Sequence, residues 1–288
     1  MGRRQVVRHR VLVSTFLGSN PSGPVLIFQL VSSQKIFLFD FDGVIVDGMQ
    51  EYWHSSLLAC ERYLNSPYIS VNQKLYKRVP NSFKEIRPWV KYGWEMILIV
   101  HEIIKTENPL KSDNKDDFIN NYHQNCQRIL NENSWIAEDI QKMLDKSRKY
   151  QIDKDFKSWV NLHKPFFEII NFMKELSKRG IKTGVITTKG KIFAEKILKQ
   201  LNIFPEFIFG YESGTKIKIA EKLTQTYEIL GFIEDRKKTL IDIKQNSETS
   251  HIPCFLADWG YLKESDKNKL SNEIKLLKLG NLGELVAI

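Results

Sequence analysis

Apolar and polar residues follow two different periods along the chain, and the change of period predicts its organisation. Residues 36–39 form a short apolar run, whereas residues 49–163 carry apolar side chains at helical spacing. After residue 163, short apolar runs take turns with amphipathic stretches, as expected for strands alternating with helices. This order is typical of a parallel sheet with right-handed crossovers. We therefore predict an α/β protein with a Rossmann-like parallel sheet core and an all-α cap domain inserted after the first strand.

The same pattern predicts the domain boundaries. Residues 1–34 form a basic N-terminal extension, for which a disordered tail, a presequence and an over-extended start are the open interpretations. Residues 35–48 and 164–288 form the α/β core domain, and residues 49–163 form the inserted helical cap domain. Within the second part of the core, we expect strands at 181–188, 207–210, 231–235 and 252–258 and helices at 166–179, 192–201 and 217–230.

Composition places the chain among soluble globular proteins. Apolar residues make up 42% and charged residues 27% of the sequence, and no run of 18 apolar residues occurs, so we expect no membrane-spanning helix. The three cysteines have no CxxC spacing, which favours reduced side chains and a cytoplasmic location. The first 39 residues contain no Asp or Glu, however, and resemble an organellar presequence, so an organellar location stays open.

A net charge of +9 raises the question of a nucleic-acid partner. The lysines alternate with acidic residues, as in EKILKQ and DKSRKY, and they form no dense basic tract. We therefore expect no nucleic-acid partner and no membrane partner. The sequence makes no prediction about the oligomeric state.

Polar residues stand at the points where the predicted strands end. Alone, each has an ordinary explanation, because a strand-end Asp often caps a helix and a Lys before a helix is usually solvated. The carboxyl ends of parallel strands meet at one edge of a sheet, however, so we expect these residues to form one cluster. The residues are Asp40 and Asp42, Thr187, Thr188 and Lys189, Lys216, Glu234 and Asp235, and Asp258.

These residue types suit a divalent cation and a phosphate group. A carboxylate can attack phosphorus, and Asp40 and Asp235 can supply oxygen ligands to Mg²⁺. The Thr187 hydroxyl and the Lys216 ammonium can neutralise charge on the transferred group. Asp42, two residues further on in a loop, could protonate the leaving oxygen and then activate water. We also expect backbone amides and the metal to keep the pKa of the attacking carboxylate low.

The ordered set resembles the haloacid dehalogenase-like (HAD) superfamily. Residues 37–48, FLFDFDGVIVDG, match its first motif, DxDG(T/V)(L/I)xD, at every fixed position. The second, third and fourth motifs are matched in the same order by Thr187, Lys216 and the acidic pair Glu234–Asp235. The resemblance covers roughly residues 35–288, and DWGY at 258–261 is similar to phosphoglycolate-phosphatase-like members with a helical cap.

The resemblance implies a role for each matched residue. Asp40 would be the nucleophile, Asp235 a metal ligand, and Asp42 both the acid–base group and a metal ligand through its backbone carbonyl. Members that cleave carbon–halogen bonds lack an acid at the second Asp position, so Asp42 favours a phosphatase or phosphotransferase. Many relatives carry a second Asp four or five residues after the fourth motif, where this chain has Thr239 and Leu240. Either Glu234 compensates as an acid that supports the metal site without binding the metal directly, or water takes the place of the second Asp.

The cap is expected to choose the substrate, and its candidate contacts in IRPWVKYGWE are Arg87, Tyr92 and Glu95. The alternative is that Arg87 forms a surface ion pair. The resulting hypothesis is a Mg²⁺-dependent phosphatase that hydrolyses a small phosphorylated metabolite through a phospho-aspartate. Alternatives are a phosphomutase of the β-phosphoglucomutase kind and a non-catalytic regulator that retains the fold.

Overall fold

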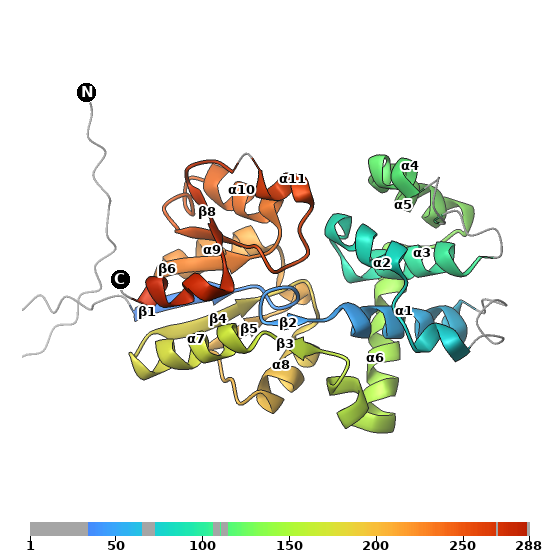
Figure 1. Cartoon of the computed structure of the whole chain (residues 1–288), viewed down its shortest axis with the longest axis horizontal. Helices are drawn as coiled ribbons and strands as arrows, with labels where there is room; N and C mark the ends of the chain where they lie inside the picture. Colours follow the sequence, from blue (N-terminus) through green and yellow to red (C-terminus); the bar gives the residue numbers. More distant parts are fainter. Residues whose placement is uncertain (1–33, 65–72, 106–109, 111–114, 269, 287–288) are drawn as a thin grey trace, which may run out of the picture. The chain divides into compact units, whose positions relative to one another are not determined.

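The computed structural model describes residues 34–64, 73–105, 110, 115–268 and 270–286 (Figure 1). The predicted N-terminal extension lies outside the described residues, except for Gln34, with which the first strand begins. The described chain from Gln34 onward belongs to one compact unit.

Six parallel strands form the central sheet of the described residues. Their order across the sheet is β5–β4–β1–β6–β7–β8, with β1 in the middle. In β1, Leu38 lies opposite Gly184 on one side and Phe232 on the other. The strands are β1 (Gln34–Phe39), β4 (Lys182–Ile186), β5 (Phe207–Phe209), β6 (Tyr227–Glu234), β7 (Cys254–Ala257) and β8 (Ile274–Leu277). The predicted α/β class with a parallel sheet is confirmed.

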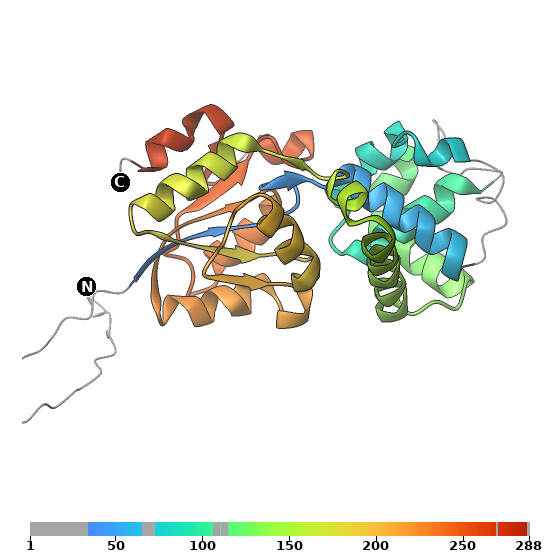
Figure 2. The same cartoon turned by 90° about the horizontal axis from the view of Figure 1, so that it is seen from below.

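Helices cover both faces of this sheet because its strands are apolar on both sides. Alternate residues of β1 point to opposite faces, so Ile36 and Leu38 join one buried cluster while Phe37 and Phe39 join another. The face of Ile36 and Leu38 is covered by α9 (Lys216–Thr224) and α10 (Lys237–Gln245). The opposite face is covered by α7 (Phe167–Lys178), α8 (Lys191–Gln200) and the 3-10 helix η4 (Leu279–Val286), as Figure 2 also shows. A short helix, α11 (Glu264–Lys267), precedes β8.

A group of helices follows β1 and has a hydrophobic core of its own. Trp53 and Leu57 of the first helix pack with Ile97 and Val100 of α3 and with Leu144 of α6. The elements are α1 (Met49–Tyr63), η1 (Gln73–Tyr76), α2 (Asn81–Ile86), η2 (Arg87–Trp89), α3 (Gly93–Ile104), α4 (Lys115–Asn120), α5 (Tyr122–Glu132) and α6 (Ala137–Val160). No helix in the described part of the chain is long and apolar enough to cross a membrane.

Two short strands join these helices to the sheet. β2 (Val46–Asp47) runs into α1, β3 (Lys164–Pro165) leads back from α6, and the two pair antiparallel. The predicted boundaries after residue 48 and after residue 163 therefore fall where the chain leaves and re-enters the α/β part. The division of the chain into autonomous core and cap domains stays a prediction.

The helix predicted over 217–230 is wrong at its C-terminal end. Helix α9 ends at Thr224, and residues 227–230 begin the eight-residue strand β6. Tyr227 and Ile229 pair with Gln34 and Ile36 of β1, so pairing in the middle of the sheet decides the conformation of a segment whose apolar spacing also fits a helix. Strand β8 was not predicted, because its four residues IKLL show no clear alternation.

Candidate active site

The ends of three neighbouring strands carry most of the predicted site residues. Asp40 directly follows β1, and β4 and β6 lie on either side of β1. Thr187 follows β4, Glu234 is the last residue of β6, and Asp235 comes next. All four side chains are buried. The strand order therefore brings them to the same edge of the sheet.

Lys216 reaches this edge from the first turn of α9, and two carboxylates hold its ammonium group. Its Nζ atom lies 2.7 Å from Asp40 Oδ1 and 2.6 Å from Glu234 Oε2. Thr215 caps the helix by accepting a hydrogen bond from the backbone N–H of Lys218, which fixes where Lys216 begins the helix. Burial opposes the charge of Lys216, but the two carboxylates outweigh it and raise its pKa.

Asp40, Glu234 and Asp235 form an acidic cluster. Each offers a carboxylate oxygen, and the three oxygens lie within 4.8 Å of one another. Burial raises the pKa of Asp40 to about 7, with Glu234 adding to the rise and Lys216 opposing it. Burial and the charge of Asp40 likewise raise the pKa of Asp235 to about 6. In the protein without a metal, desolvation thus exceeds the opposing effects of Lys216 and of the Phe41 backbone N–H, and a low pKa of Asp40 in the metal-bound protein stays a prediction.

The acidic cluster fits a divalent cation. Lys216 is ion-paired with two of the three desolvated carboxylates, so a cation placed among the three would favour their charged forms. Donors that are all oxygen suit a hard cation such as Mg²⁺. Glu234 was predicted as a supporting acid only, whereas the structure places its carboxylate in the cluster alongside Asp235.

The positions where many relatives carry a second Asp of the fourth motif hold no acid in this chain. Leu240 is buried among apolar residues, and Thr239 stands at the start of α10. Asp235 instead accepts a hydrogen bond from the backbone N–H of Tyr261 at Oδ2 (2.9 Å). Tyr261 belongs to the DWGY segment, so this segment supports the acidic cluster directly.

Asp42 lies in the loop after β1 and has partners of its own. Its Oδ2 atom accepts a hydrogen bond from the hydroxyl of Tyr52 (3.0 Å). The Nζ atom of Lys189 lies 3.4 Å from Oδ1 and 3.3 Å from Oδ2. Asp42 is thus buried and ion-paired to a lysine, separate from the Lys216 pair that holds Asp40.

Gly43 makes the close approach of this loop to Asp235 possible. Its φ of +87° lies in the left-handed region, and a Cβ there would come within 1.9 Å of Asp235 Oδ2. A side chain at position 43 would therefore displace the carboxylate as well as strain the backbone.

We expect Gly43→Ala to weaken metal binding, because the new methyl group pushes Asp235 out of the acidic cluster. Gly180→Ala is the matched control, since Gly180 also has positive φ (+72°) but no atom lies within 4 Å of its added Cβ. Both variants should lose about 1–3 kcal/mol of folding stability from backbone strain. Titration calorimetry with Mg²⁺ should show weaker binding for Gly43→Ala alone; equal metal affinity in both variants would contradict the steric argument.

The second motif is ordered by hydrogen bonds around Thr187. Its backbone N–H donates to the carbonyl of Phe209 (2.8 Å), and its Oγ1 accepts from the backbone N–H of Lys189 (3.0 Å). Thr188 follows and is half-buried. The pair therefore stands at the edge of the sheet where the acidic cluster lies, and its contact with a substrate stays a prediction.

Arg87 lies at the site and makes no ion pair with any other described residue. Its guanidinium carbon is 4.1 Å from the ring centroid of Tyr261 and 5.5 Å from that of Tyr52. Its Nε atom is buried and has no hydrogen-bond partner among the described residues. Burial opposes the charge, but the tyrosines and the carboxylates Asp235 and Asp42 raise the pKa of Arg87. A cationic group with an unused donor thus faces the site from the helical insertion.

Sequence reasoning did not identify a buried charge network beside Asp42. Glu51 and Arg148 are ion-paired at 2.8 Å, and Glu51 also lies 2.9 Å from Lys189 Nζ. These side chains are almost wholly buried, although they are separated by 97 and 138 positions in the sequence. The only local signal was Lys189 itself, which follows Thr187 and Thr188 at the end of a predicted strand.

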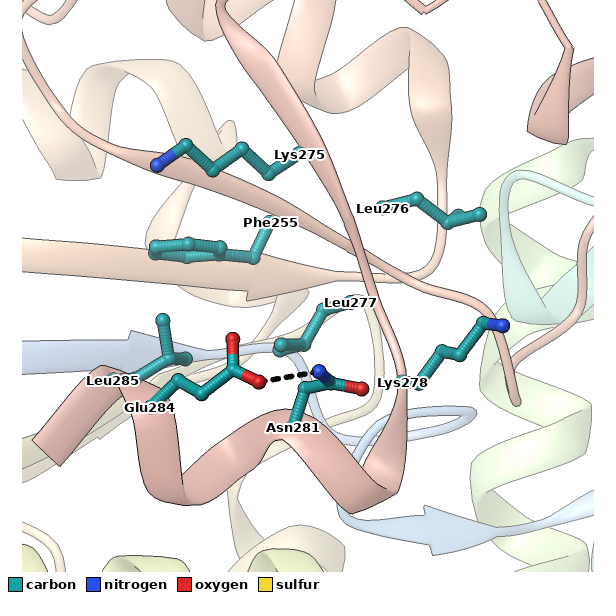
Figure 3. A pocket seen from close by; sticks show the side chains of 8 residues that line it. All are labelled: Phe255, Lys275, Leu276, Leu277, Lys278, Asn281, Glu284 and Leu285. Carbon is teal, nitrogen blue, oxygen red and sulfur yellow. Dashed lines mark hydrogen bonds between the residues drawn. The ribbon is translucent and has the colours of Figure 1, made fainter.

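A surface pocket elsewhere does not coincide with this site. It has a volume of about 480 Å³ and lies between β7, β8 and η4, where the Asn281 amide donates to the Glu284 carboxylate (2.6 Å; Figure 3). None of the predicted site residues lines it.

A family model for haloacid dehalogenase-like hydrolases matches residues 34–236. This segment contains all four predicted motifs and most of the chain, so the chain belongs to the haloacid dehalogenase-like hydrolases. It is therefore a hydrolase, as the sequence predicted. None of the curated protein sequences compared with it matches significantly.

Solved structures agree on the fold. A predicted phosphatase from Clostridium acetobutylicum is 16% identical, with a TM-score of 0.53 over 89% of this chain and 100% of the other. A proposed phosphoglycolate phosphatase from Lactobacillus delbrueckii is 16% identical, with a TM-score of 0.54 over 88% and 99%. A haloacid dehalogenase-like hydrolase from Streptococcus pneumoniae is 19% identical, with a TM-score of 0.53 over 88% and 97%. At these identities, the similarity extends to the fold alone.

Proposed function

We propose that the protein is a Mg²⁺-dependent phosphatase that hydrolyses a small phosphorylated metabolite through a phospho-aspartate. The observation that carries this proposal is the Lys216 ammonium between Asp40 and Glu234, with Asp235 in the same cluster. The cluster thus combines Asp40 as the nucleophile, Lys216 as the cation for the phosphoryl oxygens, and Glu234 and Asp235 as carboxylates for the metal. The names of the solved structures above, two of which are phosphatases by description, support the same class.

The chemistry divides between Asp40 and Asp42. An Asp40 oxygen attacks phosphorus, the bond from phosphorus to the leaving oxygen breaks, and Asp42 donates a proton to that oxygen. In the second step, Asp42 takes a proton from water, the water oxygen bonds to phosphorus, and the bond from phosphorus to the Asp40 oxygen breaks. Lys216 and the Thr187 hydroxyl compensate the charge of the phosphoryl oxygens.

The carboxylates of Asp40, Glu234 and Asp235, with the backbone carbonyl of Asp42, would hold the metal. Mg²⁺ supplies charge neutralisation to the phosphoryl group when bound. The protein's own contribution is to hold three desolvated carboxylates close together, so that binding of a cation also releases protons.

Removal of divalent cations with a chelator is expected to abolish phosphate release, and added Mg²⁺ should restore it. Asp40, with a pKa of about 7, and Asp235, with a pKa of about 6, must lose protons before they bind the ion. Metal affinity should therefore fall about tenfold per pH unit below about pH 7, and more steeply below about pH 6. Calorimetric titration with Mg²⁺ in buffers of different ionisation enthalpy measures both the affinity and the protons released. An affinity that does not change with pH would contradict the proposed ligands.

Arg87→Met is expected to raise KM about tenfold or more while kcat changes less. The reason is that the guanidinium, with its unpartnered Nε, meets the bound anion before and during reaction alike. Arg78→Met is the control, because Arg78 is an exposed arginine of the same insertion. Steady-state kinetics on a small phosphate ester would decide; unchanged KM in Arg87→Met would remove Arg87 from substrate binding.

Product analysis separates a phosphatase, which releases inorganic phosphate, from a phosphomutase, which moves the phosphoryl group to another position of the same sugar. Incubation with sugar phosphates, followed by assays of both inorganic phosphate and isomeric sugar phosphates, should yield phosphate. Isomer formation without phosphate would establish the mutase instead, and binding without any turnover would establish a regulator.

A further inference from the structure

Lys189 is a fully buried lysine that touches two carboxylates. Its Nζ atom lies 2.9 Å from Glu51 Oε2 and within 3.4 Å of both carboxylate oxygens of Asp42. Its side chain is 0% exposed, and the ring centroid of Tyr52 lies 4.3 Å from Nζ. A buried ammonium group is costly unless it is paired, so these contacts define one position for it.

The Asp42 carboxylate is confined on its other sides as well. Tyr52 donates to Oδ2, and the pKa of Tyr52 is raised well above its usual value by burial and by Asp42, so its hydroxyl keeps its proton. Gly48 packs against Oδ1 so closely that a Cβ there would lie 2.2 Å from it. Tyr52, Gly48 and Lys189 thus contact the Asp42 carboxylate from three sides and define its orientation.

Glu51 fixes the far side of Lys189. Arg148 donates to Glu51 Oε1 through Nε (2.8 Å) and to Oε2 through Nη2 (3.3 Å), and the Ser55 hydroxyl donates to Oε1 (2.7 Å). His163 lies nearby, but burial and the adjacent cations lower its pKa to about 4, so the imidazole is neutral and adds no charge. Two carboxylates, Glu51 and Asp42, and two cations, Lys189 and Arg148, alternate along this line.

We propose that Lys189 is a positioning residue for Asp42: it holds the carboxylate where that group exchanges a proton with the leaving oxygen, and Glu51 anchors it there. The inference rests on the proposed phosphatase function. Proton transfer depends on fixed geometry, and a displacement of about 1 Å costs on the order of a hundredfold in rate. Lys189 connects β4 to the helical insertion through its contact with Glu51 of α1, and the same residue orders Thr187 through its backbone N–H.

The test compares substrates whose leaving groups differ in their need for a proton. For an alkyl phosphate, Lys189→Met should lower kcat/KM about a hundredfold or more, because the leaving alkoxide must be protonated. For 2,4-dinitrophenyl phosphate, whose leaving group departs as an anion, the loss should stay below about tenfold. Lys191→Met, an exposed lysine two residues away, should change neither value. An equal loss on both substrates would overturn the inference, because Lys189 would then serve the fold or the phosphate site.

A double-mutant cycle with Asp42→Asn provides the second test. If Lys189 acts through Asp42, then Lys189→Met should add little to the loss on the alkyl phosphate once Asp42 is replaced. Full additivity would overturn the inference. A wild-type enzyme that is inactive on both esters would refute the proposed function itself, and the inference with it.

A second substitution separates an effect on folding from an effect on catalysis in Lys189→Met. Lys189→Met leaves Glu51 with one buried cation fewer, so we also propose Lys189→Met combined with Glu51→Gln. This double variant should regain the unfolding temperature of the wild type and still show the loss that depends on the leaving group. A regained unfolding temperature together with wild-type kcat/KM on the alkyl phosphate would contradict a positioning role.

Discussion

Asp40→Asn is expected to lower phosphate release by at least about 10⁴-fold while the protein remains folded. The amide cannot attack phosphorus, so the covalent intermediate cannot form. The substitution keeps the size of the side chain and removes a carboxylate whose pKa of about 7 shows that burial disfavours its charge. Stability should therefore be equal to or greater than that of the wild type near neutral pH.

The measurement is single-turnover phosphate release together with trapping of the phosphoenzyme by acid quench. Wild-type protein should show an acid-stable, hydroxylamine-sensitive phosphoryl adduct, and Asp40→Asn should show none. Asp153→Asn is the matched control, because Asp153 is an exposed aspartate on α6. An adduct of the same amount in Asp40→Asn would mean that another residue is the nucleophile.

The α/β class could be read from the sequence because the strands are short apolar runs that end in polar residues. The position of each strand end followed from the chemistry of Asp40, Thr187 and Asp235, and these residues do follow β1, β4 and β6. The boundary between α9 and β6 could not be read, since residues 227–230 fit either conformation and only pairing with β1 decides between them. Local spacing therefore predicts the site better than it predicts the exact extent of the elements around it.

The partners of the site residues were less predictable than the residues themselves. Glu51 lies in an ordinary amphipathic helix, and nothing in its neighbourhood in the sequence points to Lys189, 138 positions later. The sequence left two interpretations of Arg87, a substrate contact or a surface ion pair. Only the structure distinguishes them, because it buries the Nε atom and places the guanidinium beside Tyr261. The raised pKa of Asp40 in the protein without a metal could not be read from the sequence either, because desolvation depends on packing that sequence patterns do not contain.

The site contains two lysines that pair with different carboxylates. Lys216 pairs with Asp40 and Glu234, and Lys189 pairs with Asp42 and Glu51. Asp40 and Asp42, the first two aspartates of the first motif, thus each have their own cation. Asp40 and Asp42 can therefore be perturbed one at a time, which makes substitutions at the two lysines distinguishable.

Lys216→Met is expected to reduce phosphate release about 10³-fold. The reason is that the phosphoryl oxygens lose the Lys216 ammonium, whose attraction for them grows as negative charge develops in the transition state. It should also lower the stability of the metal-free protein by about 3–5 kcal/mol at neutral pH, since buried carboxylates are left without their cation. Burial and Glu234 raise the pKa of Asp40, and Lys216 lowers it, so the pKa should rise further in the variant.

The sign of the pH dependence follows from proton binding in the two states. The pKa of Asp40 is 3.8 in the unfolded chain and about 7 in the folded protein, so between these values the folded state binds the extra proton. Stability of the metal-free protein therefore falls as pH rises through this window, and in Lys216→Met the fall continues to higher pH. The deficit relative to the wild type should be larger at about pH 8 than at about pH 5.

Urea unfolding at these two pH values, in chelator and in saturating Mg²⁺, measures this difference. Lys218→Met is the control, because Lys218 is exposed on the same helix. Mg²⁺ should recover part of the lost stability by neutralising the same carboxylates, yet it should not recover the rate, since the ion does not replace the ammonium group at the phosphoryl oxygens. Parallel stability curves for Lys216→Met and the wild type would mean that Lys216 does not balance the charge of the acidic cluster, and the cation between Asp40 and Glu234 would lose its assigned part in both folding and catalysis.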